Sequence, residues 1–186
     1  MEHLPDADDA TLVKLLRDGD AEAWDVLTHR YSGRLWAIAR ALRLNEPDAA
    51  DVVQTAWLRL LEHVQRLREP EHVGSWLATT VRHECLRTLR RRDRAAPAEL
   101  LDGLPDDGDE PDGRLLRDER STALWRALRA LDVRCQTLLR VLMAEPAPAY
   151  QDVAAALDMQ IGSIGPTRKR CLAKLRGLLT TAPGPV

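Results

Sequence analysis

The stretch that decides the fold is residues 150–179, with the sequence YQDVAAALDMQIGSIGPTRKRCLAKLRGLL. Its first part has apolar residues at the spacing of one helix face, namely Val153, Ala154 and Leu157. Asp158 then suits a left-handed turn between two helices. Ser163 is predicted to cap the second helix, and Pro166 falls in its first turn, where a missing N–H costs little. The stretch therefore predicts a helix-turn-helix.

The second helix of this motif, residues 163–176, contains cations and no acid. The cations are Arg168, Lys169, Arg170, Lys174 and Arg176, and the inward stripe is Ile164, Cys171, Leu172 and Leu175. Five uncompensated positive charges on about 21 Å of helix suit a phosphate-lined groove. The alternative is the solvated basic face of an ordinary amphipathic helix, because the same turn length occurs in plain helical hairpins.

The bulk composition favours an all-helical protein. The 186 residues can hold two small domains, and 45% of them are hydrophobic, with many Leu and Ala and no Phe. The net charge is −2, so the chain is not a generally basic nucleic-acid binder. No apolar run approaches the roughly 20 residues that cross a bilayer, and the N-terminus is unlike a signal peptide. We therefore expect a cytoplasmic protein without membrane insertion.

The cysteines and histidines give no sign of a metal, a cofactor or a catalytic site. Cys85, Cys135 and Cys171 are far apart and form no CxxC pair. They are expected to be small core residues in a reducing cytosol, with a reactive or metal-bound role as the alternative. The histidines form no metal-binding or triad-like pattern, and no Gly-rich phosphate loop is present. The sequence therefore predicts no enzyme, no cofactor and no metal.

Four helices are expected before residue 95, over residues 11–16, 21–42, 47–67 and 70–89. Gly19 stops the first of them and Asp20 caps the second. The third has an unusually wide apolar stripe, with Asp48 and Asp51 in its first turns. Such a stripe either faces two partners, one of them outside the domain, or belongs to a central core helix.

The fourth helix ends in a cluster of arginines that follows Trp76. One or two cations normally complement a helix C-terminus, whereas this helix carries Arg82, Arg87, Arg90, Arg91, Arg92 and Arg94. Arginines beside an aromatic ring suit a surface that tracks the backbone of a single-stranded nucleic acid and stacks on its bases. A solvated basic face is the alternative.

The composition changes sharply over residues 95–113. These 19 residues include three Pro, three Gly and seven acids, and no cation. They are predicted to be a flexible acidic linker, serving either as a passive tether or as an acidic strand that mimics nucleic acid in a basic channel. The fold class that follows is all-α, with small helical domains over 1–94 and 114–180 and a frayed tail over 181–186.

With both halves in view, the chain resembles an RNA polymerase sigma factor of the extracytoplasmic-function (ECF) group, within the sigma-70 family. The resemblance covers about residues 8–180. It is carried, before the arginine-rich helix and the helix-turn-helix, by GDAEAW at 19–24, YSGRLWAIAR at 31–40, DAADVVQ at 48–54, WLRL at 57–60 and SWL at 75–77. It implies a non-catalytic promoter-specificity subunit in which residues 1–94 are region 2 and residues 114–180 are region 4.

The resemblance also implies partners and site residues. Core RNA polymerase would be bound through its largest-subunit clamp and its flap region, with contacts from Asp48, Asp51, Val52, Gln54, Trp57, Leu60 and Leu61. The melted −10 element would be read as a single strand by Trp76, Arg82, His83, Arg87, Arg90 and Arg91. The duplex −35 element would be read in the major groove by Ser163, Pro166, Thr167, Arg168, Lys169, Arg170 and Lys174. An anti-sigma factor is a further partner that the resemblance admits, and nucleoid association is expected in the holoenzyme.

Several positions depart from the family pattern. Ala50 and Thr55 stand where the family usually has Glu, and His83 where it often has Asn. Ala149 replaces the usual Ser or Thr before the first tyrosine of the helix-turn-helix. Residues 165–167, Gly-Pro-Thr, replace a common Lys-Ser-Arg run, which shifts the expected −35 contacts towards Arg168 and Arg170.

Two other functions are compatible with parts of the sequence. A stand-alone transcriptional regulator would use the helix-turn-helix alone and would bind duplex DNA specifically without polymerase. A helical adaptor without DNA binding would use its basic faces as soluble surface, although two cationic helices and one acidic linker argue against it.

Overall fold

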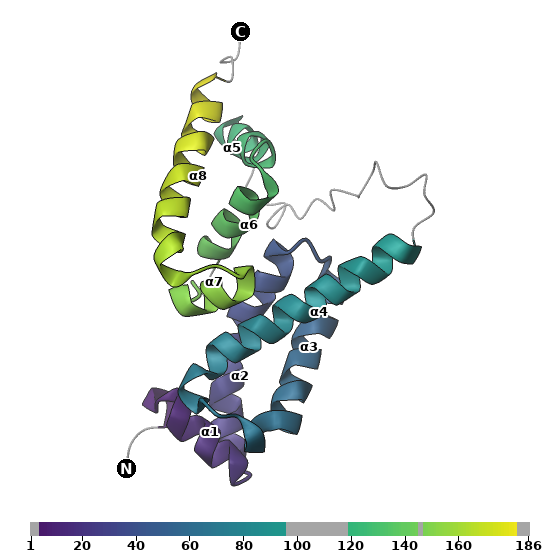
Figure 1. Cartoon of the computed structure of the whole chain (residues 1–186), viewed down its shortest axis with the longest axis vertical. Helices are drawn as coiled ribbons and strands as arrows, with labels where there is room; N and C mark the ends of the chain where they lie inside the picture. Colours follow the sequence, from purple (N-terminus) through teal and green to yellow (C-terminus); the bar gives the residue numbers. More distant parts are fainter. Residues whose placement is uncertain (1–3, 96–118, 145–146, 182–186) are drawn as a thin grey trace.

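The structure, a computed structural model, describes residues 4–95, 119–144 and 147–181. Every regular element in these ranges is a helix, which confirms the all-α class (Figure 1). The elements are η1 (Leu4–Asp6), α1 (Asp9–Arg17), α2 (Ala21–Ala41), α3 (Glu46–His63), η2 (Val64–Arg66), η3 (Pro70–His72), α4 (Val73–Ala95), α5 (Glu119–Arg129), α6 (Val133–Leu142), α7 (Tyr150–Leu157) and α8 (Ile161–Thr181). The predicted linker lies outside the described residues, except for Ala95 at the end of α4.

Side-chain caps fix where the N-terminal helices begin. Asp20 accepts hydrogen bonds from the backbone N–H groups of Glu22 and Ala23, which confirms the predicted cap of α2. Asn45 caps α3 in the same way through the N–H of Asp48, at 3.0 Å. The third helix was predicted to run to residue 67, but α3 ends at His63 and a 3-10 turn follows.

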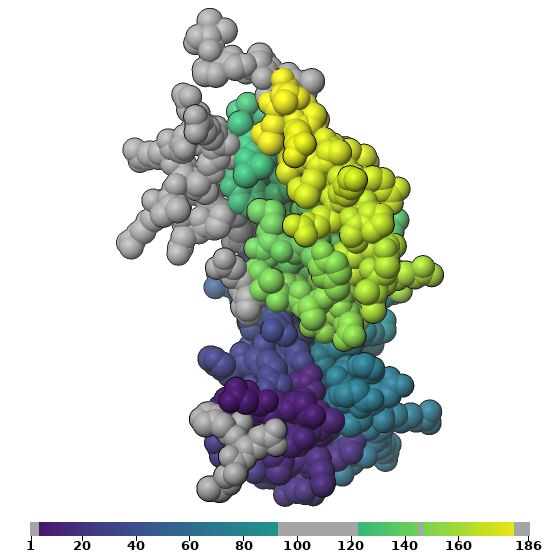
Figure 2. All heavy atoms as spheres, turned by 90° about the vertical axis from the view of Figure 1, so that its left-hand side faces the viewer, coloured from purple at the N-terminus to yellow at the C-terminus, as the bar shows by residue number. Residues whose placement is uncertain are grey.

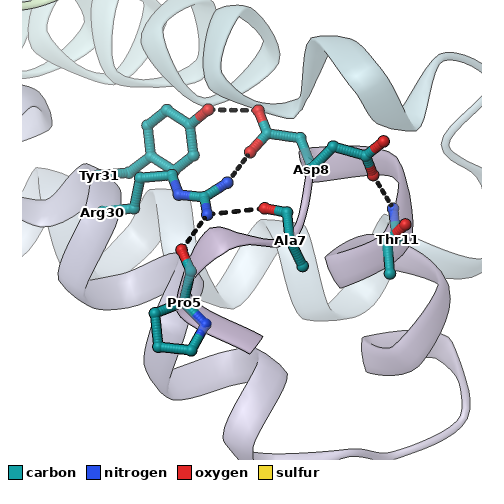
Figure 3. A network of polar contacts seen from close by, with 7 residues as sticks. Pro5, Ala7, Asp8, Thr11, Arg30 and Tyr31 are labelled. Carbon is teal, nitrogen blue, oxygen red and sulfur yellow. Dashed lines mark hydrogen bonds and ion pairs between the residues drawn. The ribbon is translucent and has the colours of Figure 1, made fainter. Parts of the chain in front are cut away.

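Helices α1–α4 share one core, whose largest fully buried side chains are Leu12, Leu27, Leu35, Ile38, Leu60 and Leu77. A polar network ties η1 and α1 to α2 (Figure 3). Arg30 donates to the carboxylate of Asp9 at 2.6 Å and to the carbonyls of Pro5 and Ala7. The hydroxyl of Tyr31 donates to the same carboxylate. The start of the chain is therefore anchored through charge-assisted hydrogen bonds.

The C-terminal helices contain a disulfide that the sequence prediction missed. Cys135 on α6 and Cys171 on α8 are bonded, with their Cα atoms 5.3 Å apart. The expectation of three separate core thiols is therefore wrong for this pair, because the turn after α7 brings α8 back against α6. Cys85 remains free and buried in α4. Asp132 caps α6 and also pairs with Lys174 at 2.8 Å, so two links join α6 to α8.

The helix-turn-helix is formed by α7, a turn at Asp158 and α8. Asp158 has φ 54° and ψ 52°, which confirms the predicted left-handed turn. The second helix begins at Ile161 rather than at Ser163, whose hydroxyl donates to the Gln160 carbonyl instead of capping. Pro166 is consequently the sixth residue of α8 and lies in the helix interior, not in its first turn. Gly165 before it has no Cβ, which removes the clash that proline makes with a preceding helical residue.

The two halves of the chain pack against each other, with α7 lying across α4 and α6 against α2 (Figures 1 and 2). Polar contacts cross this boundary. Arg43 donates to the Gln136 amide oxygen at 2.7 Å, Arg82 pairs with Asp158 at 3.2 Å, and Ser75 donates to Asp152 at 3.4 Å. Within the described ranges, no helix is long and apolar enough to cross a bilayer.

Candidate nucleic-acid interface and docking groove

An apolar groove lies between α2 and α3. Its volume is about 450 Å³, and it is lined by Trp24, Ser32, Trp36, Ala50, Val53, Gln54, Trp57, Leu58 and Leu61. The rings of Trp24 and Trp57 meet edge to face with centroids 5.3 Å apart and form its rigid wall. Leu58 and Leu61 are 53% and 47% exposed. Large apolar side chains at a concave surface mark a place where another protein can bind.

The residues predicted to bind polymerase divide into two groups in the structure. Asp51, Gln54 and Leu61 are exposed on α3 and are free to contact a partner. Val52, Trp57 and Leu60 are buried, so their side chains support this surface from within the domain. Asp48 is half-buried and pairs with Arg92 near the end of α4.

The predicted polymerase-binding residues left out six residues of the groove: Trp24, Ser32, Trp36, Ala50, Val53 and Leu58. Trp24 and Trp36 lie on α2, and Leu58 lies on the exposed side of α3. A signal for Trp24 and Trp36 was present in the sequence, because both lie in motifs that carry the family resemblance, GDAEAW at 19–24 and YSGRLWAIAR at 31–40. No spacing rule places Leu58 in the same groove, since the groove needs the crossing of α2 over α3.

The predicted −10 surface lies along α4. His83, Arg87, Arg90 and Arg91 are exposed, whereas Trp76 is half-buried with its ring 6.2 Å from the His63 ring. Arg82 is partly covered, because it pairs with Asp158 in the turn of the helix-turn-helix. The structure therefore places the cations on one helix and brings α7 over part of it.

Glu84 holds this arginine-rich helix on its neighbour. It is a buried carboxylate that pairs with Arg59 of α3 at 2.7 Å and with Arg87 of α4 at 3.3 Å. The opposite charges of the two guanidinium groups offset the cost of burying this carboxylate. Glu84 therefore fixes α4 against α3.

The predicted −35 residues lie at the start and middle of α8. Pro166, Arg168, Lys169 and Arg170 are exposed, and Arg168 lies 3.4 Å from the Tyr150 hydroxyl. Ser163 is half-buried. Thr167 is 7% exposed and accepts a hydrogen bond from Arg170, so its side chain faces inward. Lys174 pairs with Asp132, which means that the five cations of this helix are not all uncompensated as predicted.

A buried carboxylate lies between the helix-turn-helix and the N-terminal half. Asp152 of α7 is 6% exposed and accepts a hydrogen bond from Ser75. Burial raises the pKa of Asp152, while the charge of Arg34 and the Ser75 hydrogen bond oppose this shift. No group of three or more metal-ligating side chains occurs in the ranges that the structure covers.

Comparison with known proteins agrees with this two-part helical arrangement. Residues 27–95 match the family Sigma-70 region 2. The chain is 27% identical over 161 residues to the ECF RNA polymerase sigma factor SigE of Mycolicibacterium smegmatis, a match that covers 84% of this chain and 62% of the relative. It is 23% identical over 166 residues to the RNA polymerase sigma-H factor of Pseudomonas aeruginosa, covering 84% and 86% of the two chains. The first relative is thus matched over less than two thirds of its length.

Two solved structures have the same fold. CnrH in complex with the cytosolic domain of CnrY superposes with a TM-score of 0.60 at 19% identity, over 94% of this chain and 99% of that one. The sigma factor RpoE in complex with the anti-sigma factor NepR from Bartonella quintana gives a TM-score of 0.55 at 22% identity, over 80% and 91%.

The α1–α4 fold and the region 2 match define a sigma-70 type protein. Among such proteins, the curated relatives include a second ECF factor, the ECF RNA polymerase sigma-E factor of Haemophilus influenzae, at 21% identity. The chain belongs to the ECF group of the sigma-70 family.

Proposed function

We propose that this chain is a non-catalytic subunit that binds core RNA polymerase and directs it to a subset of promoters. The observation that carries the proposal is the combination of three surfaces on one small chain: the apolar groove of α2 and α3, the arginines of α4, and the cationic face of α8. Docking, single-strand binding and duplex binding each need one of them.

The groove is the proposed docking site for core polymerase. Leu58 and Leu61 supply exposed apolar area, and the two tryptophan rings hold the groove open without needing a rearrangement. Exposed Asp51 and Gln54 beside it would add polar contacts that set the orientation of the partner. A helix of the polymerase clamp fits a groove of this kind.

The α4 surface is proposed to hold the melted −10 strand. Arg87, Arg90 and Arg91 are exposed and can contact phosphates, while the ring of Trp76 offers an edge for a base. Exposed Arg168, Lys169 and Arg170 of α8 are proposed to enter the major groove of the −35 duplex. Thr167 faces inward and would support Arg170 rather than touch a base.

The two halves of the chain have to separate if one molecule is to bind the −10 and −35 elements at the same time. The −10 and −35 elements lie roughly two DNA turns apart, about 70 Å. In the structure α7 contacts α4, and Arg82 is paired with the turn of the helix-turn-helix. The contacted arrangement is therefore proposed to be the form without polymerase, and the solved complex of RpoE with the anti-sigma factor NepR supports an anti-sigma factor as a further partner of this chain.

In vitro transcription with bare core polymerase over a promoter library tests the proposal. We expect the purified chain to confer initiation at a subset of promoters and to bind free duplex DNA weakly. Failure to start transcription at any promoter would contradict the sigma-factor function. Specific duplex binding without polymerase would favour a stand-alone regulator.

A substitution in the groove tests the docking step. Leu61→Arg should weaken binding to core polymerase at least about tenfold, a change of about 1.4 kcal/mol, because a charge would enter an apolar contact. Leu179→Arg is the matched control, since Leu179 is 37% exposed on α8, on the other half of the chain from the groove. Equal affinities of the two variants for polymerase, measured by fluorescence anisotropy, would remove the groove from the interface.

A further inference from the structure

The proposed function gives no role to the disulfide between α6 and α8. Cys135 is the third residue of α6, and Cys171 lies on the buried face of α8, next to the cationic run Arg168–Arg170. We propose that Cys135 and Cys171 are a reversible thiol–disulfide site that peroxides oxidise, and that the bond fixes α8, the proposed DNA-reading helix, on the rest of the C-terminal half.

The surroundings of Cys135 suit the attacking thiol of such a pair. Cys135 is 5% exposed, whereas Cys171 has no exposed surface. The N-terminus of α6 carries a partial positive charge, which favours the thiolate, the form that attacks a peroxide. The ammonium group of Lys174 lies 2.8 Å from the carboxylate of Asp132, which caps the N–H of Cys135, and so neutralises the negative charge that this cap places at the helix end.

The chemistry balances with one peroxide molecule. The Cys135 thiolate attacks one oxygen of hydrogen peroxide, the O–O bond breaks, and a sulfenic acid and hydroxide form. The Cys171 thiol then attacks the Cys135 sulfur, the S–O bond breaks, and water leaves as the disulfide forms. Two thiols lose two electrons, and the peroxide with the two protons becomes two waters. A small dithiol reverses the reaction by thiol–disulfide exchange.

The position of the disulfide determines which part of the C-terminal half it restrains. The two cysteines are 36 residues apart in the sequence, and the segment between them contains α7, the turn and the first half of α8, so the bond closes this part of the helix-turn-helix into one loop. Closing a loop of this size restricts the unfolded chain. Inside the folded domain, the bond and the Lys174–Asp132 pair hold α8 on α6 at neighbouring turns. Reduction leaves the exposed and weak ion pair together with the packing of Ile164 and Leu175, which involves no covalent link.

Cys85 is the internal control. It is buried in α4 and free, and burial raises the pKa of its thiol to about 12, so at neutral pH it is in the unreactive thiol form. Peroxide should therefore oxidise Cys135 and Cys171 and leave Cys85 as a free thiol in the same molecule.

Thiol counting on the full chain tests the proposal without polymerase or DNA, so its outcome is independent of the proposed function. The reduced chain is treated with hydrogen peroxide, unfolded, alkylated and analysed by mass spectrometry. We expect the alkylated thiols to fall from three to one, a Cys135–Cys171 peptide to appear, and dithiothreitol to restore three. Cys85→Ser should keep this two-thiol change, and Cys171→Ser should abolish it. A thiol count that peroxide leaves unchanged, or a bond that involves Cys85, would overturn the proposal.

Hydrogen exchange tests the second half of the claim and needs no substitution. In the oxidised chain, amides of α6 and α8 should exchange at least about tenfold more slowly than in the reduced chain, while those of α1–α3 stay the same. Equal exchange in α8 in the two forms would show that the bond does not fix the helix, and would overturn that part of the proposal.

Discussion

At position 74 the fold requires a residue without a side chain. A Cβ on Gly74 would lie 2.6 Å from Cε1 and 2.9 Å from the hydroxyl oxygen of Tyr31. That ring cannot move aside easily, because it is buried and its hydroxyl donates to Asp9. The start of α4 can therefore approach α2 only with glycine at this position.

Gly74→Ala is expected to destabilise the protein by about 1–3 kcal/mol, the usual cost of overpacking a core. The free energy of unfolding in urea measures the change. Gly177→Ala in α8 is the matched control, since a Cβ there meets nothing within 4 Å, and it should stabilise by about 0.5–1 kcal/mol. Equal effects of the two substitutions would contradict the close approach of Tyr31 and Gly74.

Asp152 contacts Ser75 of the N-terminal half, and burial of its negatively charged carboxylate at this contact is unfavourable. Burial raises its pKa, so the native state binds this proton more tightly than the unfolded chain does. The pKa of this carboxyl is 3.8 in the unfolded chain and higher in the folded protein. The contribution of Asp152 to stability therefore falls as the pH rises from 3.8 through the folded-state pKa, and it stays low at higher pH. At neutral pH the ionised carboxylate is a cost, only partly offset by Arg34.

Asp152→Asn removes that charge and keeps a group that can accept from Ser75. We expect the variant to have a higher melting temperature than the wild type at neutral pH, and the difference to shrink as the pH falls through the raised pKa of Asp152 towards 3.8, because the wild-type carboxyl is then protonated in the folded state. Thermal unfolding of both proteins between about pH 4 and pH 8 measures it. A difference that is constant with pH would contradict the raised pKa.

At the scale of the elements, the first two turns of α8 are intrinsically weak. Gly162 and Gly165 have a low helix propensity, and Pro166 has no N–H to donate to the carbonyl of Gly162 four residues earlier. The helix is nevertheless continuous, because Ile164, Cys171 and Leu175 are buried against the rest of the C-terminal half. Packing, and not local preference, holds this end of the helix in place.

Pro166→Ala restores the missing donor and is expected to stabilise the C-terminal half by about 1–3 kcal/mol. Pro166 is exposed, so the change removes no core contact. Circular dichroism should show a melting temperature that is raised by several degrees, and hydrogen exchange should slow in residues 161–166. A lower melting temperature would mean that the proline is stabilising in this helix, through the unfolded chain.

The sequence predicted which helices form more accurately than where each helix ends or which other helices it packs against. Apolar spacing located the helices, and Asp20 and Asp158 were placed correctly because cap and turn residues act locally. Ser163 was misplaced as a cap because α8 starts two residues earlier, without a side-chain cap signal in the sequence. The bond between Cys135 and Cys171 depends on how α8 folds back on α6, which spacing along the chain does not reveal.

The predicted site residues show the same limit. The wide apolar stripe on α3 was compatible with either an outside partner or a central core helix, and periodicity could not separate buried Leu60 from exposed Leu61. Arg82 was assigned to DNA because it lies among other arginines, whereas its pairing with Asp158 joins positions 76 residues apart. Contacts between distant segments decide which charges are available, and a single sequence does not contain them.

At the scale of the whole molecule, the α7–α4 contact conflicts with the proposed binding of two promoter elements at once. If the chain reads two elements about 70 Å apart, its halves must move apart when it binds polymerase and promoter. The polar contacts at the boundary that has to open are an exposed ion pair, a 2.7 Å hydrogen bond from Arg43 to Gln136, and the hydrogen bond from Ser75 to Asp152, whose charge is unfavourable. These polar contacts are weak, so the close packing of α7 on α4 is the main interaction that binding to polymerase and promoter would have to replace.

Spin labels at His83→Cys and Gln160→Cys would measure this opening directly, because both positions are exposed and flank the Arg82–Asp158 pair. The free chain should give one short distance between the labels, and the complex with core polymerase and promoter DNA should give a distance that lengthens towards about 70 Å. Adding Asp152→Lys should raise the fraction of long distances in the free chain, since the new cation faces Arg34. A short distance that persists in a complex active in transcription would show that the two halves read DNA without separating.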